Sequence, residues 1–142
     1  MIVMDHQRLD AYRLSLEFLV DARGHIQRLP SGHADLADQL LRAATSIPLN
    51  IAEGAGEFSS RDKARFYRMA RRSATECAAI LDVFVHLGLL ATESVQPGME
   101  RLGRIVAMLV RIARHHEAQA SQRTAATGKG TRAGTGWGSG SG

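Results

Sequence analysis

Residues 46–54 read SIPLNIAEG and place a proline, Pro48, inside an apolar pattern of helical period. Apolar side chains recur at steps of three and four residues on both sides of the proline, at Leu36, Leu40, Ala44, Ile47 and Ile51. A proline removes a backbone hydrogen bond and costs roughly 3 kcal/mol in a helix interior, so the packing around the helix has to offset that cost. The stretch therefore predicts a kinked helix with one face in a core.

The chain up to about His116 divides into further helical segments and has no strand pattern. Apolar periodicity, bounded by proline, glycine or capping residues, predicts helices over residues 9–28, 33–56, 59–88 and 92–116. Ser59 and Asp62 have the spacing of a capping box at the start of the third helix. The second helix is expected to end at Gly54 and Gly56, which tolerate left-handed backbone conformation. Helices with short connections favour an all-α fold, an antiparallel up-down four-helix bundle.

Each predicted helix carries an apolar stripe, and further apolar residues lie outside the stripes. The first helix is expected to bury Leu9, Tyr12, Leu16, Leu19 and Ile26, and the third to bury Phe66, Ala70, Cys77, Ile80 and Phe84. The apolar residues outside the stripes are Leu41, Leu81, Val83, Val85, Leu89, Leu90, Ile105 and Val110. A monomer would expose these residues as patches, so they predict a homo-oligomer.

The chain has 142 residues, enough for one aliphatic core and too few for two ordinary domains. Residues 1–118 are predicted to form the bundle, and residues 119–142 a flexible, disordered tail, because its Gly, Ser and Thr residues bury too little surface to offset ordering entropy. Trp137 in the tail is either an accident of composition or an anchor for a protein partner. The tail also holds much of the net charge of +4, which leaves the bundle nearly neutral.

Basic residues recur along the third predicted helix. Arg61, Arg65, Arg68 and Arg72 fall within about 60° of one another at roughly 100° per residue, on the side away from its apolar stripe. Lys63 and Arg71 are expected to broaden this ridge. It can neutralise phosphates and bind RNA or DNA, or its arginines can pair with carboxylates of neighbouring helices or subunits.

A second polar group lies near the predicted core faces: Arg42, Asn50, Glu53 and Glu76. Charged groups close to a core need partners, so we expect Arg42 to pair with Glu53 or Glu76. Asn50 is expected to bond to a carbonyl near Pro48. This structural polar cluster is the favoured interpretation; the alternative, carboxylates that hold two metal ions, lacks the Glu-x-x-His companions of such bundles.

The sequence indicates no catalytic residue, no cofactor and no metal site. The histidines are scattered without ligand spacing, and the single Cys77 excludes an internal disulfide and fits a reducing interior. The N-terminal residues lack a signal-peptide pattern, and no apolar stretch reaches the roughly 18 residues of a membrane span. We therefore expect a cytoplasmic protein without a membrane segment.

Two segments together carry a family resemblance: SIPLNIAEG, with Arg42 before it, and ARRSATEC at residues 70–77. They resemble a family of small bacterial four-helix-bundle proteins encoded in intervening sequences of 23S ribosomal RNA genes. The resemblance implies an antiparallel four-helix bundle that assembles into ring-like homo-oligomers, pentamers being favoured, and no established enzymatic activity. A related branch comprises accessory proteins of diversity-generating retroelements, in which a basic bundle oligomer binds reverse transcriptase and nucleic acid.

Two hypotheses for the function follow. In the first, the chain is a non-enzymatic, homo-oligomeric interaction module that contacts nucleic acid through the basic ridge of the third helix. In the second, it is a structural assembly or adaptor protein that recruits a protein partner, which includes a reverse transcriptase in a diversity-generating retroelement.

Overall fold

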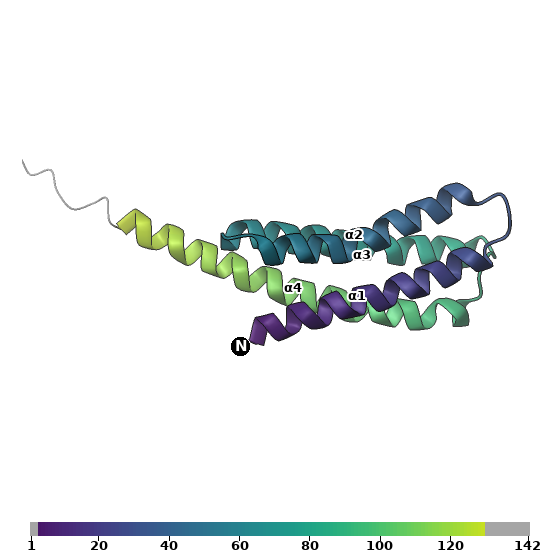
Figure 1. The fold of residues 1–142 in the computed structure, drawn as a ribbon, viewed down its shortest axis with the longest axis horizontal. Helices are drawn as coiled ribbons and strands as arrows, with labels where there is room; N and C mark the ends of the chain where they lie inside the picture. The colour runs from purple at the N-terminus through teal and green to yellow at the C-terminus, as the bar shows by residue number, and fades with distance from the viewer. Residues whose placement is uncertain (1–2, 130–142) are drawn as a thin grey trace, which may run out of the picture.

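The computed structural model describes residues 3–129, which form an antiparallel bundle of four helices without strands in that range. The helices are α1 (Val3–Arg28), α2 (Ala34–Gly56), α3 (Ser60–His86) and α4 (Thr92–Lys129). α1 packs against α2 and α4, and α3 packs against the same two helices. Each helix thus lies beside its neighbours in chain order, and α4 closes the bundle against α1 (Figure 1). The predicted up-down topology is confirmed.

Pro48 lies inside α2, and its side chain is buried. Ile47 and Ile51 on either side of it are almost completely buried, so packing offsets the lost backbone hydrogen bond. The ribbon of α2 changes direction near its middle (Figure 1), as the proline predicts. α2 ends at Gly56 with ordinary negative φ angles, whereas the glycines of positive φ in the described range are Gly32 and Gly88, one in each of two helix connections.

The predicted apolar stripe of α1 is wrong in its first part by a rotation of the helix, whereas its members Leu19 and Ile26 are partly buried and pack against the core. Leu9, Tyr12 and Leu16 are 47%, 39% and 41% exposed. The core instead receives a stripe that contains several small side chains: Ala11, Leu14, Ser15, Phe18 and Ala22. Two stripes with helical spacing compete on this helix, and the one with small residues allows closer approach of the neighbouring helices.

Ion pairs between α1 and α4 also require this rotation. Arg101 Nε lies 3.2 Å from Glu17 Oε2, and its guanidinium also contacts the carboxylate of Asp21. Glu17 and Asp21 are one turn apart, so both reach α4 when Phe18 points into the core. The apolar periodicity of α1 alone does not indicate ion-pair partners that lie on another helix.

The capping and core residues predicted for α3 are largely confirmed. The backbone N–H of Asp62 donates to Ser59 Oγ at 3.1 Å, which caps the helix. Ala70, Cys77, Ile80 and Phe84 are buried as expected. Near the start of the helix, Tyr67 takes the core position, and Phe66 is only half-buried.

α4 continues to Lys129, beyond its predicted end near His116 (Figure 1). Residues 119–129 of the predicted tail are therefore helical, because alanine and other strong helix formers dominate them and the next glycine is Gly128. The hydroxyl of Ser60 donates to Gln119 Oε1 at 3.1 Å, which ties the start of this overhang to α3. Trp137 and the rest of the predicted tail lie outside the described residues.

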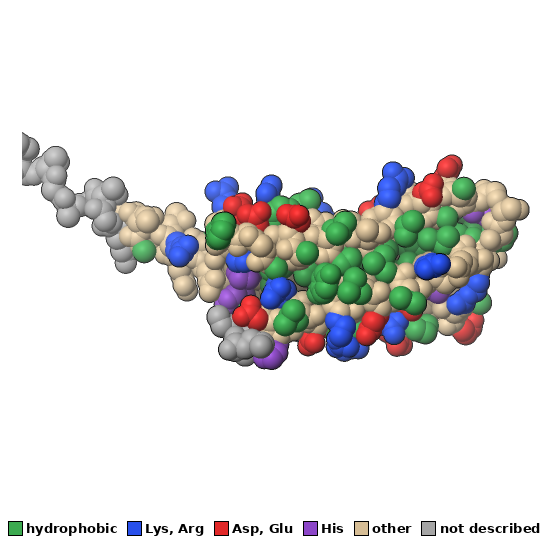
Figure 2. All heavy atoms as spheres, viewed as in Figure 1, with side chains coloured by type: hydrophobic (Ala, Val, Ile, Leu, Met, Phe, Trp, Pro, Cys, Tyr) green, Lys and Arg blue, Asp and Glu red, His purple; other side chains and the backbone are tan. Residues whose placement is uncertain are grey.

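An apolar face remains exposed over α1 and α2. Besides Leu9, Tyr12 and Leu16, it includes Val20 on α1 and Leu41 and Leu49 on α2. Figure 2 shows hydrophobic side chains gathered between these two helices. Among the apolar residues predicted to lie outside the stripes, Leu41 and Val83 are exposed, whereas Leu81 and Ile105 belong to the core. None of the helices within residues 3–129 has an apolar stretch long enough to cross a membrane.

Candidate nucleic-acid interface

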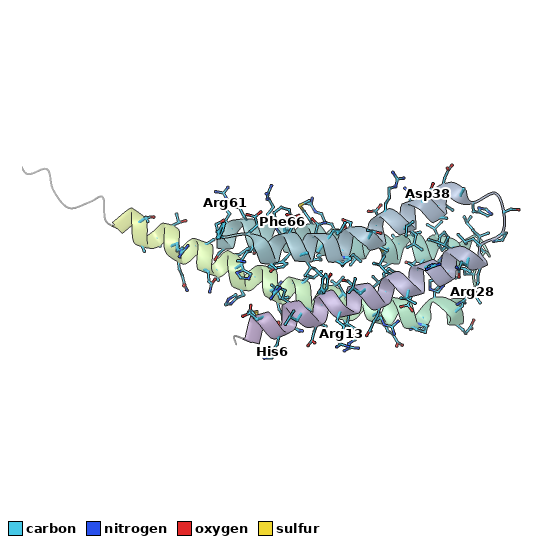
Figure 3. The ribbon with its side chains drawn as sticks, in the orientation of Figure 1. His6, Arg13, Arg28, Asp38, Arg61 and Phe66 are labelled. Carbon is cyan, nitrogen blue, oxygen red and sulfur yellow. The ribbon has the colours of Figure 1, made fainter. Side chains whose placement is uncertain are left out.

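The basic residues of α3 form a ridge on the outer side of the bundle. We call Arg61, Arg65, Arg68 and Arg72 the arginine ridge. All four are exposed, on the side of α3 opposite the buried Tyr67, Ala70 and Ala74. Figure 3 shows Arg61 pointing away from the bundle. The helix thus carries the arginine ridge and its core contacts on opposite faces, as its periodicity predicts.

Three guanidinium groups of the arginine ridge are available for a partner. Arg68 Nη1 lies 2.5 Å from Glu117 Oε1 on α4, and this pair is about half exposed. Arg61, Arg65 and Arg72 make no ion pair within residues 3–129. The guanidinium of Arg65 lies 4.8 Å from the centre of the Phe66 ring, a cation–π distance that holds the charge at the surface. An anion can therefore reach these groups without breaking an internal ion pair.

Lys63 does not belong to the arginine ridge, and that part of the prediction is wrong. Its ammonium group donates to the carbonyl oxygens of Gly54 at 3.3 Å and Ala55 at 3.1 Å. Those carbonyls lie in the last turn of α2, where helical N–H donors run out; the carbonyl of Gly54 also accepts a hydrogen bond from the backbone N–H of Glu57 at 3.3 Å. Lys63 is on the core side of α3 and caps α2 instead of facing solvent. Arg71 is exposed, as expected.

Three arginines on α4 extend the basic surface and were missed from sequence. Arg104, Arg111 and Arg114 are exposed and have no ion pair in the described part of the chain. Arg114 lies one helical turn before Glu117, the partner of Arg68, so the row on α4 meets the arginine ridge at that pair. The three- and seven-residue spacing of these arginines places them on one side of α4, and that signal was present in the sequence.

A groove accompanies the arginine ridge where α4 leaves the bundle. It has a volume of about 620 Å³ and lies between the first turns of α3 and the overhang of α4. Arg61 lines one side, Ser121 and Thr124 line the other, and the Arg68–Glu117 pair lies between them. Guanidinium groups opposite hydroxyl groups are suited to contact a phosphate backbone.

The polar cluster of α2 and α3 contains an interhelical hydrogen-bond network. Asn50 Nδ2 donates to the carbonyl oxygen of Ser46 at 2.9 Å and to its hydroxyl at 2.8 Å. The hydroxyl of Ser73 on α3 donates to the same Ser46 hydroxyl at 2.8 Å. Asn50 thus bonds to the carbonyl of Ser46, near Pro48 as expected. Ser46 lies two residues after Ala44, whose carbonyl lacks its usual helical donor because of Pro48.

The expected ion pair of Arg42 is not formed. Arg42, Glu53 and Glu76 are exposed, and no ion pair joins them within residues 3–129. Arg42 and Glu76 line a shared hollow of about 370 Å³ with Ser46 and Ser73, whereas Glu53 lies apart from it. The charges lie in water outside the core faces, where an ion pair gains little.

Cys77 is an unreactive core residue. It is completely buried, and burial raises the pKa of its thiol to about 12. The thiol is therefore neutral at pH 7 and packs as a small apolar group. No group of three or more potential metal ligands occurs in the described range.

The 23S rRNA-intervening sequence protein family matches residues 7–111, most of the bundle from α1 into α4. The chain belongs to this family. Within the family match lie the arginine ridge, the Asn50 network, Arg104 and Arg111, whereas Arg114 and the overhang of α4 lie beyond it.

A solved structure has the same fold as this 23S rRNA-intervening sequence protein. It is a protein of unknown function from the S23 ribosomal protein family of Bacteroides thetaiotaomicron, with a TM-score of 0.70 at 23% identity. The match covers 76% of this chain and 98% of that chain. At this identity the likeness concerns the fold. No curated protein matches the sequence significantly.

Proposed function

We propose that this chain is a non-enzymatic, homo-oligomeric interaction module that contacts nucleic acid through the arginine ridge of α3. The observation that carries the proposal is the set of exposed guanidinium groups without internal ion pairs, Arg61, Arg65 and Arg72. A row of such groups on one helix face can neutralise successive phosphates.

The arginines of α4 support the same proposal. Arg114 lies one helical turn from Glu117 in the Arg68–Glu117 pair, and Arg111 lies one turn before Arg114, so exposed cationic groups occur on both α3 and α4. The groove between α3 and the overhang gives a nucleic-acid strand a path along it. Binding through phosphates is insensitive to sequence, so we expect RNA or DNA to be recognised by its charge and shape.

The exposed apolar face over α1 and α2 supports the homo-oligomeric part of the proposal. Leu16 on α1 is 41% exposed, and Leu41 and Leu49 on α2 are 47% and 60% exposed. Leu41 and Leu49 flank a hollow of about 460 Å³ that a side chain of another subunit can fill. This face is separate from the arginine ridge, so assembly leaves the ridge accessible. A ring is the expected form, and a pentamer is favoured by the family resemblance.

The second candidate function is a structural assembly or adaptor protein that recruits a protein partner, as an accessory protein recruits reverse transcriptase. The Arg68–Glu117 pair favours this candidate, because it is an example of a ridge arginine bound to a carboxylate. In that case the remaining arginines pair with carboxylates of the partner or of another subunit.

The deciding experiment measures binding of duplex DNA and structured RNA over a series of salt concentrations. Each phosphate contact adds about 0.9 to the log–log salt slope for duplex DNA and about 0.7 for single strands. Reversal of Arg61 and Arg65 to Glu should abolish binding and leave the oligomer intact. A matched control reverses Arg23 and Arg28, two exposed arginines of α1 that, like Arg61 and Arg65, make no ion pair in the described residues. Loss of the oligomer in the ridge variant, or no binding by the parent at low salt, favours the assembly function.

A further inference from the structure

A pocket lies at the end of the bundle where α4 leaves it, away from the arginine ridge. It has a volume of about 250 Å³ and is lined from all four helices. Figure 2 shows histidine side chains beside basic ones at this end, near the start of α1. We call it the end pocket and define it by the charged and aromatic residues that line it, namely Asp5, Arg8, Lys63, Tyr67, His115 and His116.

Two stacked rings form one wall of the end pocket. Tyr67 is 1% exposed, and its ring stacks on that of His116 with centres 5.6 Å apart and an angle of 27° between the planes. His115 contacts His116 edge-on at 5.0 Å. The wall is therefore held rigidly by packing, which is the condition for a preformed binding site.

Cationic groups outnumber anionic ones in the end pocket. Arg8 and Lys63 are the permanent cations, and Asp5 is the single carboxylate. Lys63 is held in place by its two hydrogen bonds to the end of α2. Neither Arg8 nor Asp5 makes an ion pair within the described residues, so the half-buried guanidinium of Arg8 has no internal counterion.

One ring nitrogen of His116, a residue that lines the end pocket, lacks a partner. His116 Nδ1 is buried and makes no hydrogen bond in the described structure. Buried polar atoms almost always have partners, because an unmade hydrogen bond is costly. An oxygen acceptor bound in the pocket can accept a hydrogen bond from this nitrogen when the ring carries its proton there.

A second, more open hollow adjoins the end pocket and shares Lys63, His116 and Gln119 with it. Its volume is about 530 Å³. Phe58, which is completely exposed, and Arg123 line its outer part. An exposed aromatic ring beside a cation is a surface on which a flat organic group can stack.

We propose that the end pocket binds a phosphate monoester group, with Arg8, Lys63 and the histidine pair around the phosphate and the organic part of the ligand against Phe58. The volume of the end pocket suits a small anion, because pockets for drug-sized ligands begin at about 300 Å³. The phosphate belongs either to a free mononucleotide or to the terminal phosphate of an RNA strand.

The end pocket and the arginine ridge lie on opposite sides of α3. Lys63 and Tyr67 are four residues apart on the core side, whereas Arg61 points outward (Figure 3) and Arg65, four residues on, is exposed on the same face. The two proposals therefore fail separately. Reversal of Arg61 and Arg65 leaves phosphate binding in the end pocket unchanged, and loss of the end pocket leaves salt-dependent binding to the ridge.

The test is a titration of the full chain, monitored by backbone amide NMR and by calorimetry. The probes are inorganic phosphate, adenosine monophosphate against adenosine, and a short RNA with a 5′-phosphate against the same RNA with a 5′-hydroxyl. We expect saturable shifts at Arg8, Lys63, Tyr67 and His116 with every phosphate monoester, and none with adenosine. The tighter of the two phosphate monoesters identifies the source of the ligand.

Variants assign the binding to named side chains. Arg8→Gln should weaken phosphate binding about 10- to 100-fold, the loss of one charge-assisted hydrogen bond. His116→Phe keeps the ring stack on Tyr67 and removes the nitrogens. The controls are Arg13→Gln on α1 and His86→Phe on α3, both exposed residues outside the pocket.

Three results overturn the proposal. The first is equal affinity for adenosine and its monophosphate. The second is absence of shifts around the end pocket at millimolar phosphate, or shifts confined to the arginine ridge. The third is equal binding by Arg8→Gln and Arg13→Gln. Titration of the unmutated protein with these probes tests the proposal even where a variant fails to fold.

Discussion

Gly54 and Tyr67 fit so closely that a β-carbon on Gly54 would lie 2.8 Å from Cε1 and 3.1 Å from Cζ of the tyrosine ring. Gly54 is the last residue of SIPLNIAEG, and its φ angle is not positive. The glycine is therefore required for close approach of α2 and α3, and not for the left-handed backbone that glycine also tolerates. Because Tyr67 in turn stacks on His116, this contact aligns three helices.

Gly54→Ala should destabilise the fold by about 1–3 kcal/mol, because the new methyl group overpacks against the Tyr67 ring. Gly56→Ala is the matched control, since a β-carbon there meets no atom within 4 Å. It should be neutral or slightly stabilising, as alanine is the better helix former. Chemical denaturation of both variants measures the difference. Equal stability would show that Tyr67 moves aside at no cost.

Asn50→Ala should lower the free energy of unfolding by about 1 kcal/mol, because it removes the amide that bonds to Ser46 beside the proline bend. Glu53→Ala is the control from the same motif and should change stability little, since Glu53 is exposed without an ion pair. Thermal unfolding of the two variants checks this order. The reverse order would assign the structural role to Glu53.

Stability should fall as the pH drops below 6.5, because His25 is buried with neither ring nitrogen hydrogen-bonded in the described structure. Burial, followed by the charge of Arg28, lowers the pKa of His25, and Asp21 opposes this only in part. Below pH 6.5 the unfolded chain therefore binds more protons than the folded chain. The contribution of neutral His25 to stability is complete above pH 6.5 and is lost as the pH falls towards the pKa of His25 in the folded protein.

His25→Phe should reduce this pH dependence, measured as the change in melting temperature between neutral and mildly acidic buffer. A part will persist, because burial also lowers the pKa of His116. His86→Asn is the control, since His86 is exposed. An unchanged pH profile in His25→Phe would assign the effect to other groups.

Leu49→Glu should dissociate the oligomer without unfolding the subunit, because Leu49 lies on the exposed apolar face over α1 and α2 and is 60% exposed. Leu87→Glu changes a leucine of similar exposure, 57%, at the end of α3. Light scattering at micromolar concentration gives the mass of each variant. A monomeric parent, or dissociation by Leu87→Glu alone, contradicts this choice of interface.

Local sequence was sufficient for the helices and for much of α3. Apolar spacing and capping residues predicted helix positions to within a few residues, except at the start of α1 and at the C-terminal end of α4. Ser59 caps α3 as its spacing indicates. The arginine ridge was predictable for the same reason, because side chains four residues apart on one helix share a face whatever the helix packs against. These features depend on contacts within a few residues of each other in the chain.

The rotation of α1, the partners of the polar cluster and the direction of Lys63 were decided by contacts between helices. Phe18 is buried, and Leu16 exposed, because Glu17 and Asp21 reach Arg101 on α4 only in that orientation. Lys63 turns inward because the last carbonyls of α2 lie beside it. A helical pattern specifies a period but not which of two overlapping apolar stripes faces the core, and that choice depends on side chains distant in sequence.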